Sequence, residues 1–121
     1  MARDNVPVTD LSKNSMVDRG AGVTIVVANG AEIQCNGDTR GLFIEVTNTN
    51  GTDRVLTIKA GDLPPALLAG QGDLALTIPA TSGDKLICLE GARFVQDDGK
   101  ILVDFAASFA GVIRAFRVPK L

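Results

Sequence analysis

The sequence predicts an all-β protein, an antiparallel β-sandwich of the jelly-roll type preceded by an extended N-terminal arm. Eight or nine short runs rich in apolar and β-branched residues follow one another, with turn residues every eight to twelve positions. The best of these runs is residues 42–47. There aliphatic side chains alternate with aromatic or polar ones, as the two-residue period of a strand requires. No long helix is expected, so the strands must bury their apolar faces against each other in two layers.

The chain divides into an arm at residues 1–22 and one sandwich domain at residues 23–121. Its 121 residues are a single-domain length. Hydrophobic residues make up 45% of the chain and charged residues 21%, which is a composition typical of a folded protein and not of a disordered one. The first 22 residues are polar and of mixed charge, with isolated apolar residues among them. Two interpretations stay open: a frayed terminus, or an arm that orders on a partner with Val6, Val8 and Leu11 as anchors.

The first strand is expected at residues 23–28 (VTIVVA), followed by a turn and a short extended piece at residues 31–35. The clearest pattern lies at Arg40–Ala60, where two alternating runs flank the turn residues 48–53. This arrangement predicts a β-hairpin.

A long loop is expected at Gly61–Asp73 (GDLPPALLAGQGD), since Pro64 and Pro65 cannot donate ladder hydrogen bonds. It carries the apolar pair Leu67 and Leu68. An exposed pair of this kind either covers the core or contacts another subunit.

Strands are expected next at residues 74–78 and 85–90, the second of them buried on both faces. A second hairpin is expected around Asp97-Asp98-Gly99, between strands at residues 93–96 and 100–105.

The last stretch fits both a helical and an alternating period. Ser108 and Gly111 supply a break, and consistency with the preceding strands favours a strand–loop–strand arrangement that ends near Val118.

The composition argues against enzymatic chemistry. The chain has no His, and therefore no ordinary general base near neutral pH, no Ser–His or Cys–His pair and no imidazole ligand. No cofactor or metal site is expected. Glu32, Glu45 and Glu90 are interpreted as residues of solvated strand faces. A net charge of −2 provides no basic surface for nucleic acid.

Cys35 and Cys88 lie 53 positions apart, with no CxxC motif. They form either one disulfide or two free buried thiols, and the second state is favoured. The N-terminus lacks a signal-peptide core and no apolar window is long enough to span a membrane, so we expect a soluble protein made in a cytoplasm.

Three segments carry a resemblance to a known class of proteins. They are NGAEIQCNGDTRGLFIEVTNTNGTDRVLTIKAG (29–61), ARFVQDDGKILVDF (92–105) and VIRAFRVP (112–119). Their arrangement resembles small capsid decoration, or cement, proteins of tailed bacteriophages, which have a jelly-roll-type sandwich. The resemblance covers residues 23–119 and leaves the arm outside.

The resemblance implies a non-enzymatic virion protein, made in the bacterial host, that sits as a homotrimer on the capsid surface. Its partners would be the major capsid protein lattice and its own copies, with no nucleic acid or membrane. We expect Arg3, Val6, Val8 and Leu11 to contact the capsid, and Leu67 and Leu68 to contact a neighbouring subunit. Two alternatives remain: a tail or head–tail joining protein, and a carbohydrate-binding or adhesin module. The absence of Trp and Tyr counts against the second.

Overall fold

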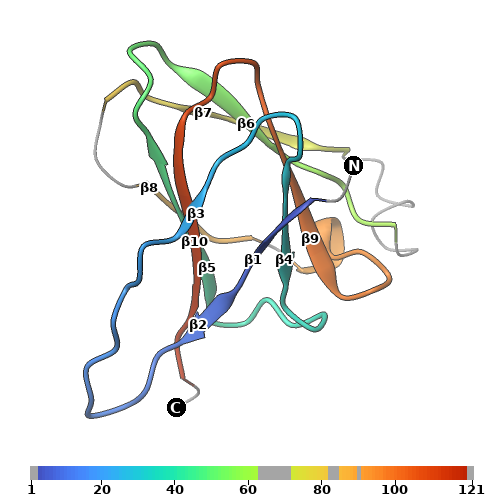
Figure 1. The fold of residues 1–121 in the computed structure, drawn as a ribbon. Helices are drawn as coiled ribbons and strands as arrows, with labels where there is room; N and C mark the ends of the chain where they lie inside the picture. The colour runs from blue at the N-terminus through green and yellow to red at the C-terminus, as the bar shows by residue number, and fades with distance from the viewer. Residues whose placement is uncertain (1–2, 63–71, 82–84, 90, 120–121) are drawn as a thin grey trace.

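The computed structural model describes residues 3–62, 72–81, 85–89 and 91–119. In this part of the chain the secondary structure is almost entirely β (Figure 1). The elements, in chain order, are β1 (Asp4–Val6), β2 (Val8–Asp10), β3 (Val23–Thr24), β4 (Ala31–Gln34), β5 (Leu42–Asn48), β6 (Arg54–Ile58), β7 (Leu74–Ile78), β8 (Lys85–Ile87), the helical turn α2 (Gly91–Phe94), β9 (Lys100–Phe105) and β10 (Gly111–Arg117).

These strands form two sheets that pack face to face. Sheet A has the strand order β1-β4-β9-β6-β7, and sheet B has the order β2-β10-β5-β8, with β3 also paired to β10. The predicted all-β sandwich is therefore confirmed. Its sheets are mixed and not purely antiparallel, because β1 runs parallel to β4 and β2 runs parallel to β10.

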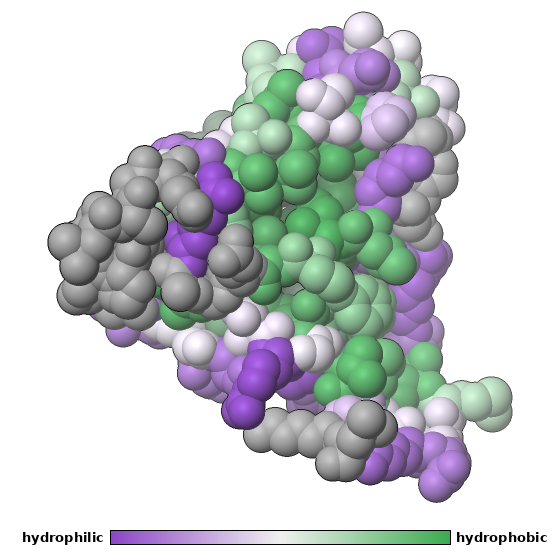
Figure 2. All heavy atoms as spheres, turned by 180° about the vertical axis from the view of Figure 1, so that it is seen from behind, coloured by the Kyte–Doolittle hydropathy of each residue, from purple (hydrophilic) through white to green (hydrophobic). Residues whose placement is uncertain are grey.

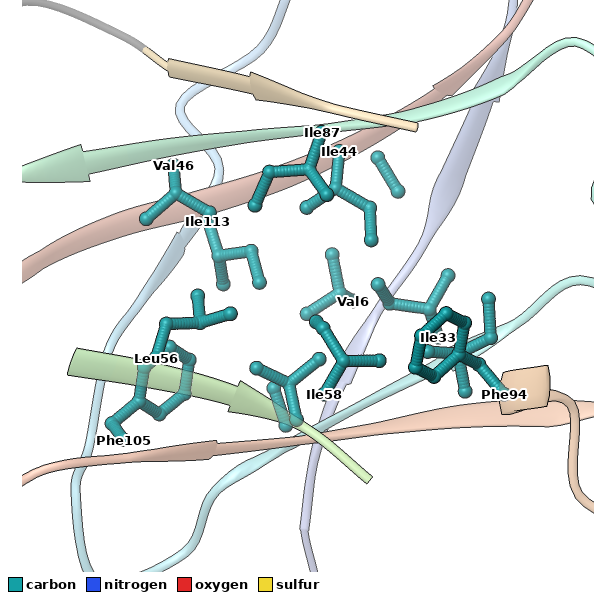
Figure 3. Packing of buried hydrophobic residues seen from close by; sticks show 14 of the residues in the cluster. Val6, Ile33, Ile44, Val46, Leu56, Ile58, Ile87, Phe94, Phe105 and Ile113 are labelled. Carbon is teal, nitrogen blue, oxygen red and sulfur yellow. The ribbon is translucent and has the colours of Figure 1, made fainter. Parts of the chain in front are cut away.

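The core fills the space between the two sheets (Figure 3). The core is formed by every second residue along the strands. In β9, Ile101, Val103 and Phe105 are buried, and the residues between them are half-buried. Side chains of sheet B meet those of sheet A across this layer, and their burial is the main favourable term in folding. The residues labelled in Figure 3 are Val6, Ile33, Ile44, Val46, Leu56, Ile58, Ile87, Phe94, Phe105 and Ile113.

The chain crosses from one sheet to the other at Pro7. β1 ends at Val6 in sheet A, and β2 starts at Val8 in sheet B. Proline cannot donate a ladder hydrogen bond, which suits the corner where a strand changes sheet. Residues 4–10 thus belong to the sandwich, and only the remainder of the predicted arm, residues 11–22, lies between β2 and the next strand.

The predicted central hairpin is wrong, although both of its strands exist. β5 lies in sheet B between β10 and β8, whereas β6 lies in sheet A between β9 and β7. The turn between them arches over one end of the sandwich. Asn48 holds this arch: it is 1% exposed, and its Nδ2 donates to the Ile78 carbonyl at 3.0 Å while its Oδ1 accepts from the Asn50 amide at 2.9 Å. These bonds satisfy a buried amide.

Strands β7, β9 and β10 lie where the sequence predicted them, including the break at residues 106–110. The predicted first strand is shorter than expected, because the chain turns after Thr24: the amides of Asn29 and Gly30 both donate to the Val26 carbonyl.

Two other predictions are corrected. The segment expected as a strand at residues 93–96 begins as the helical turn α2, which places Phe94 in the core. The strand expected to be buried on both faces is the three-residue edge strand β8, where Leu86 points outward at 64% exposure and Ile87 inward at 8%.

Both cysteines are free thiols, as favoured from the sequence. Cys35 is buried, with its Sγ 3.2 Å from the Gly99 carbonyl oxygen. Cys88 is exposed, which contradicts the expectation of two buried thiols.

Candidate functional site

A loop at residues 11–22, called here the projecting loop, extends away from the sandwich between β2 and β3 (Figure 1). Its two flanking strands pair with the same edge of β10: β2 with residues 115–117 and β3 with residues 112–113. The loop therefore leaves and rejoins sheet B at one edge, and the sheet fixes both of its ends.

Apolar side chains lie uncovered on this loop. Met16 is 100% exposed and Val17 is 38% exposed. At the base, Leu11 is half-buried and its amide donates to the Arg117 carbonyl at 2.8 Å. A rigid scaffold that presents apolar side chains on a loop is a common arrangement for a binding surface.

Arg114 fastens the returning half of the loop to sheet B. Its Nη1 pairs with Glu45 Oε1 at 2.8 Å, and its Nε and Nη2 each donate at 3.1 Å to the carbonyls of Gly20 and Ala21. Both side chains of the ion pair are only 11% exposed.

Glu45 was interpreted from the sequence as a residue of a solvated face, and this is wrong. The returning half of the loop crosses that face, and Arg19 adds a second ion pair to Glu45 at 3.5 Å. Gly22 permits the close approach: it has a φ of +80°, and a Cβ at this position would collide with the side chain of Val112.

A cavity of about 240 Å³ opens at the base of the loop. It lies at the edge of β10, between the places where β2 and β3 are paired. Three of its lining residues, Val6, Ile113 and Ala115, belong to the core and are each 1% exposed. The other lining residues are Pro7, Thr9, Arg19, Gly20, Ala21, Gly22, Val23 and Arg114.

The predicted capsid-contacting residues lie mostly in the body of the sandwich. Val6 is a core residue, so its side chain does not lie on the outer surface of the sandwich. Arg3 is held on sheet A, where Nη1 donates to the Val103 carbonyl at 2.9 Å and pairs with Asp104 at 2.6 Å. Val8 is half-buried against the core, and Leu11 lies at the loop base.

Leu67 and Leu68, the predicted subunit contacts, lie outside the described residues. Figure 2 shows another apolar surface on the back of the molecule, where hydrophobic residues form a broad area. The edge strands β7 and β8 carry some of the partly buried or exposed apolar side chains, namely Leu74, Leu76 and Leu86.

A second charged cluster ties the C-terminal end of β10 to the turn after β4. Arg117 Nη2 donates to the carbonyl of Asp38 at 2.7 Å, and Arg40 makes a two-point contact with the Asp38 carboxylate at 3.1 and 3.2 Å. The hydrogen bonds from the Arg40 side chain and amide lower the pKa of Asp38 from 3.8 to about 2.

We expect the Arg40→Ala variant to raise the pKa of Asp38 back toward 3.8. Because the folded-state pKa is depressed, the stabilisation from this carboxylate is present above pH 3.8 and is lost as the pH falls toward 2. Titrating the side-chain carboxyl carbon by NMR measures the midpoint directly. The control Lys85→Ala removes a cation from β8 and should leave it unchanged. An unchanged midpoint in Arg40→Ala contradicts this account.

Among the described residues, no three His, Cys, Asp or Glu side chains gather closely enough to hold a metal ion. The same part of the chain contains no helix with the length and apolar character needed to cross a membrane. Comparison with protein-family models, with curated proteins and with solved structures found no match. The projecting loop, its ion-paired anchor and the cavity together form a surface suited to binding a partner.

Proposed function

We propose that this chain is a structural virion protein that binds the outside of a tailed-phage capsid as a homotrimer and stabilises the shell. The observation that carries the proposal is the projecting loop with Met16 fully exposed. Burying such a side chain against a partner releases about 1.5–3 kcal/mol. The resemblance of residues 23–119 to decoration proteins supplies the identity of the partner.

The architecture suits attachment. The loop is fixed at both ends by β10, and Arg114 holds Gly20 and Ala21 of its returning half, so these parts of the loop need no further ordering on binding. Many copies on one shell, each with a modest contact, produce a large combined stabilisation. The capsid contact is assigned to Met16 and Val17, with Leu11 kept at the loop base, in place of the sequence-based assignment to Arg3, Val6 and Val8.

The test is binding of the purified protein to matching expanded capsid shells, followed by sedimentation. The double variant Met16→Asp/Val17→Asp should weaken binding at least about tenfold, since each aspartate must be desolvated in the interface. Its thermal midpoint should stay unchanged because both residues are exposed. The control Val55→Asp places one such aspartate at an exposed apolar position on β6 in sheet A, far from the loop in the fold.

Failure of the wild-type protein to bind shells rejects the proposal. Equal binding by the double variant rejects the loop as the contact. Recovery of the protein with separated tails, and not with heads, supports the alternative of a tail or head–tail joining protein.

A further inference from the structure

The cavity at the base of the projecting loop exists because one edge of β10 is shared by two strands. β2 is paired up to Ala115 and β3 up to Ile113, so neither strand is paired with Arg114 between them. The cavity opens at this interruption and reaches Val6, Ile113 and Ala115 of the core. It is therefore a hollow in the edge of the sheet, with core residues at its floor and residues of β2 and the projecting loop in its walls.

The chemistry of the lining selects an uncharged, apolar occupant. Two charged side chains, Arg19 and Arg114, contribute to the walls, and both are ion-paired to Glu45. Arg114 also donates to two carbonyls of the loop. An anionic ligand would have to compete with Glu45 for these guanidinium groups, whereas an apolar group contacts the apolar lining, such as Pro7 and Val23, at no such cost.

The size of the cavity selects one side chain. Its volume of about 240 Å³ exceeds the ~150 Å³ of an apolar cavity that admits benzene, and falls below the ~300–1,000 Å³ of pockets for drug-sized ligands. A single leucine, methionine or phenylalanine side chain fits within this volume, but a peptide strand or helix does not.

We propose that this cavity receives a single apolar side chain from the capsid protein on which the projecting loop docks. Residues 19–22 form one wall of the cavity and belong to the same loop that presents Met16 and Val17, so a surface docked on the loop adjoins the cavity. An apolar anchor in a pocket beside exposed apolar contacts is the usual arrangement of a binding hot spot. This inference rests on the proposed function, which supplies the partner.

Blocking the cavity tests the inference. Ala21→Leu and Thr9→Leu each place a larger side chain in the cavity wall, so that it fills part of the cavity. Ala21 lies on the loop and Thr9 on β2. Each should weaken shell binding about ten- to a hundredfold, the value of one buried aliphatic anchor. Their matched controls are Ala75→Leu and Thr77→Leu, at exposed positions on β7 that do not line the cavity. These controls should bind like the wild type.

A second measurement is independent of the capsid. Titration of the protein with benzene should shift the methyl NMR signals of Val23 and Ile113, and the shifts should be lost in Ala21→Leu. Absence of any shift in the wild type overturns the cavity as an apolar site. A normal titration in a protein that never binds shells rejects the proposed function and the capsid as partner, and leaves the cavity as an apolar site.

Two further outcomes overturn the assignment of the occupant. Shell binding that Ala21→Leu and Thr9→Leu leave unchanged shows that docking does not use the cavity. Concentration-dependent self-association of the wild type that both variants abolish identifies the occupant as a side chain of a second copy, for which Met16 is the exposed candidate.

Discussion

Replacing Gly111 by alanine is expected to lower the free energy of unfolding by about 3 kcal/mol. Gly111 is the first residue of β10 and has a φ of +146°, a conformation that L side chains rarely adopt. A Cβ at this position would also overlap the backbone carbonyl of Thr47 on the neighbouring strand β5. A backbone group cannot move aside as a flexible side chain can, so β10 must shift against β5.

The shift would spread to β3, because the carbonyl of Gly111 accepts the amide of Ile25 at 2.9 Å. Urea denaturation followed by circular dichroism measures the loss. The matched control is Gly51→Ala in the arch between β5 and β6, where an added Cβ meets nothing within 4 Å and the change should be close to neutral. Equal stability of the two variants would show that β10 tolerates displacement at its start.

The strands were predictable because alternation is a local property of the sequence. Residues 74–78 and 100–105 alternate visibly, and the structure has β7 and β9 there. Pairing was not predictable, because the same two strands and turn can close as a hairpin within one sheet or as an arch between two. The arch between the two sheets is stabilised by a hydrogen bond from Asn48 to the carbonyl of Ile78, 30 positions away. No local pattern in the sequence contains this contact.

The strand pairing of the N-terminal segment was not predictable for a different reason. Val6 and Val8 alternate with their neighbours as strand residues do, but Pro7 between them and the polar residues that follow made the whole stretch resemble an arm. Parallel pairing to β4 and β10 is non-local, so it left no signal apart from this short alternation. Met16 and Val17 were visible as apolar residues in a polar stretch, and only the fold shows that they are the uncovered ones.

Replacing Glu45 by glutamine is expected to lower the free energy of unfolding by about 3 kcal/mol, since it leaves a buried guanidinium without its counter-ion. Arg114 is 11% exposed, and its remaining bonds to Gly20 and Ala21 are to neutral carbonyls. The control is Arg40→Ala, which breaks the Asp38 pair where the arginine is 76% exposed, and exposed pairs of this kind contribute little to the free energy of unfolding. Urea denaturation of both variants makes the comparison.

The double variant Glu45→Leu/Arg114→Leu separates stability from attachment. Apolar replacement of a buried ion pair is often neutral or stabilising, so the double variant should unfold at a higher urea concentration than Glu45→Gln. It nevertheless loses both bonds from Arg114 to the projecting loop. Amide exchange in residues 19–22 should accelerate, and shell binding should fall because a loosened loop must be ordered again on the partner. Retained shell binding would mean that the ion pair serves the sandwich alone. Because Arg114 also lines the cavity, loss of binding identifies it as the residue that positions the projecting loop only if the double variant still binds benzene.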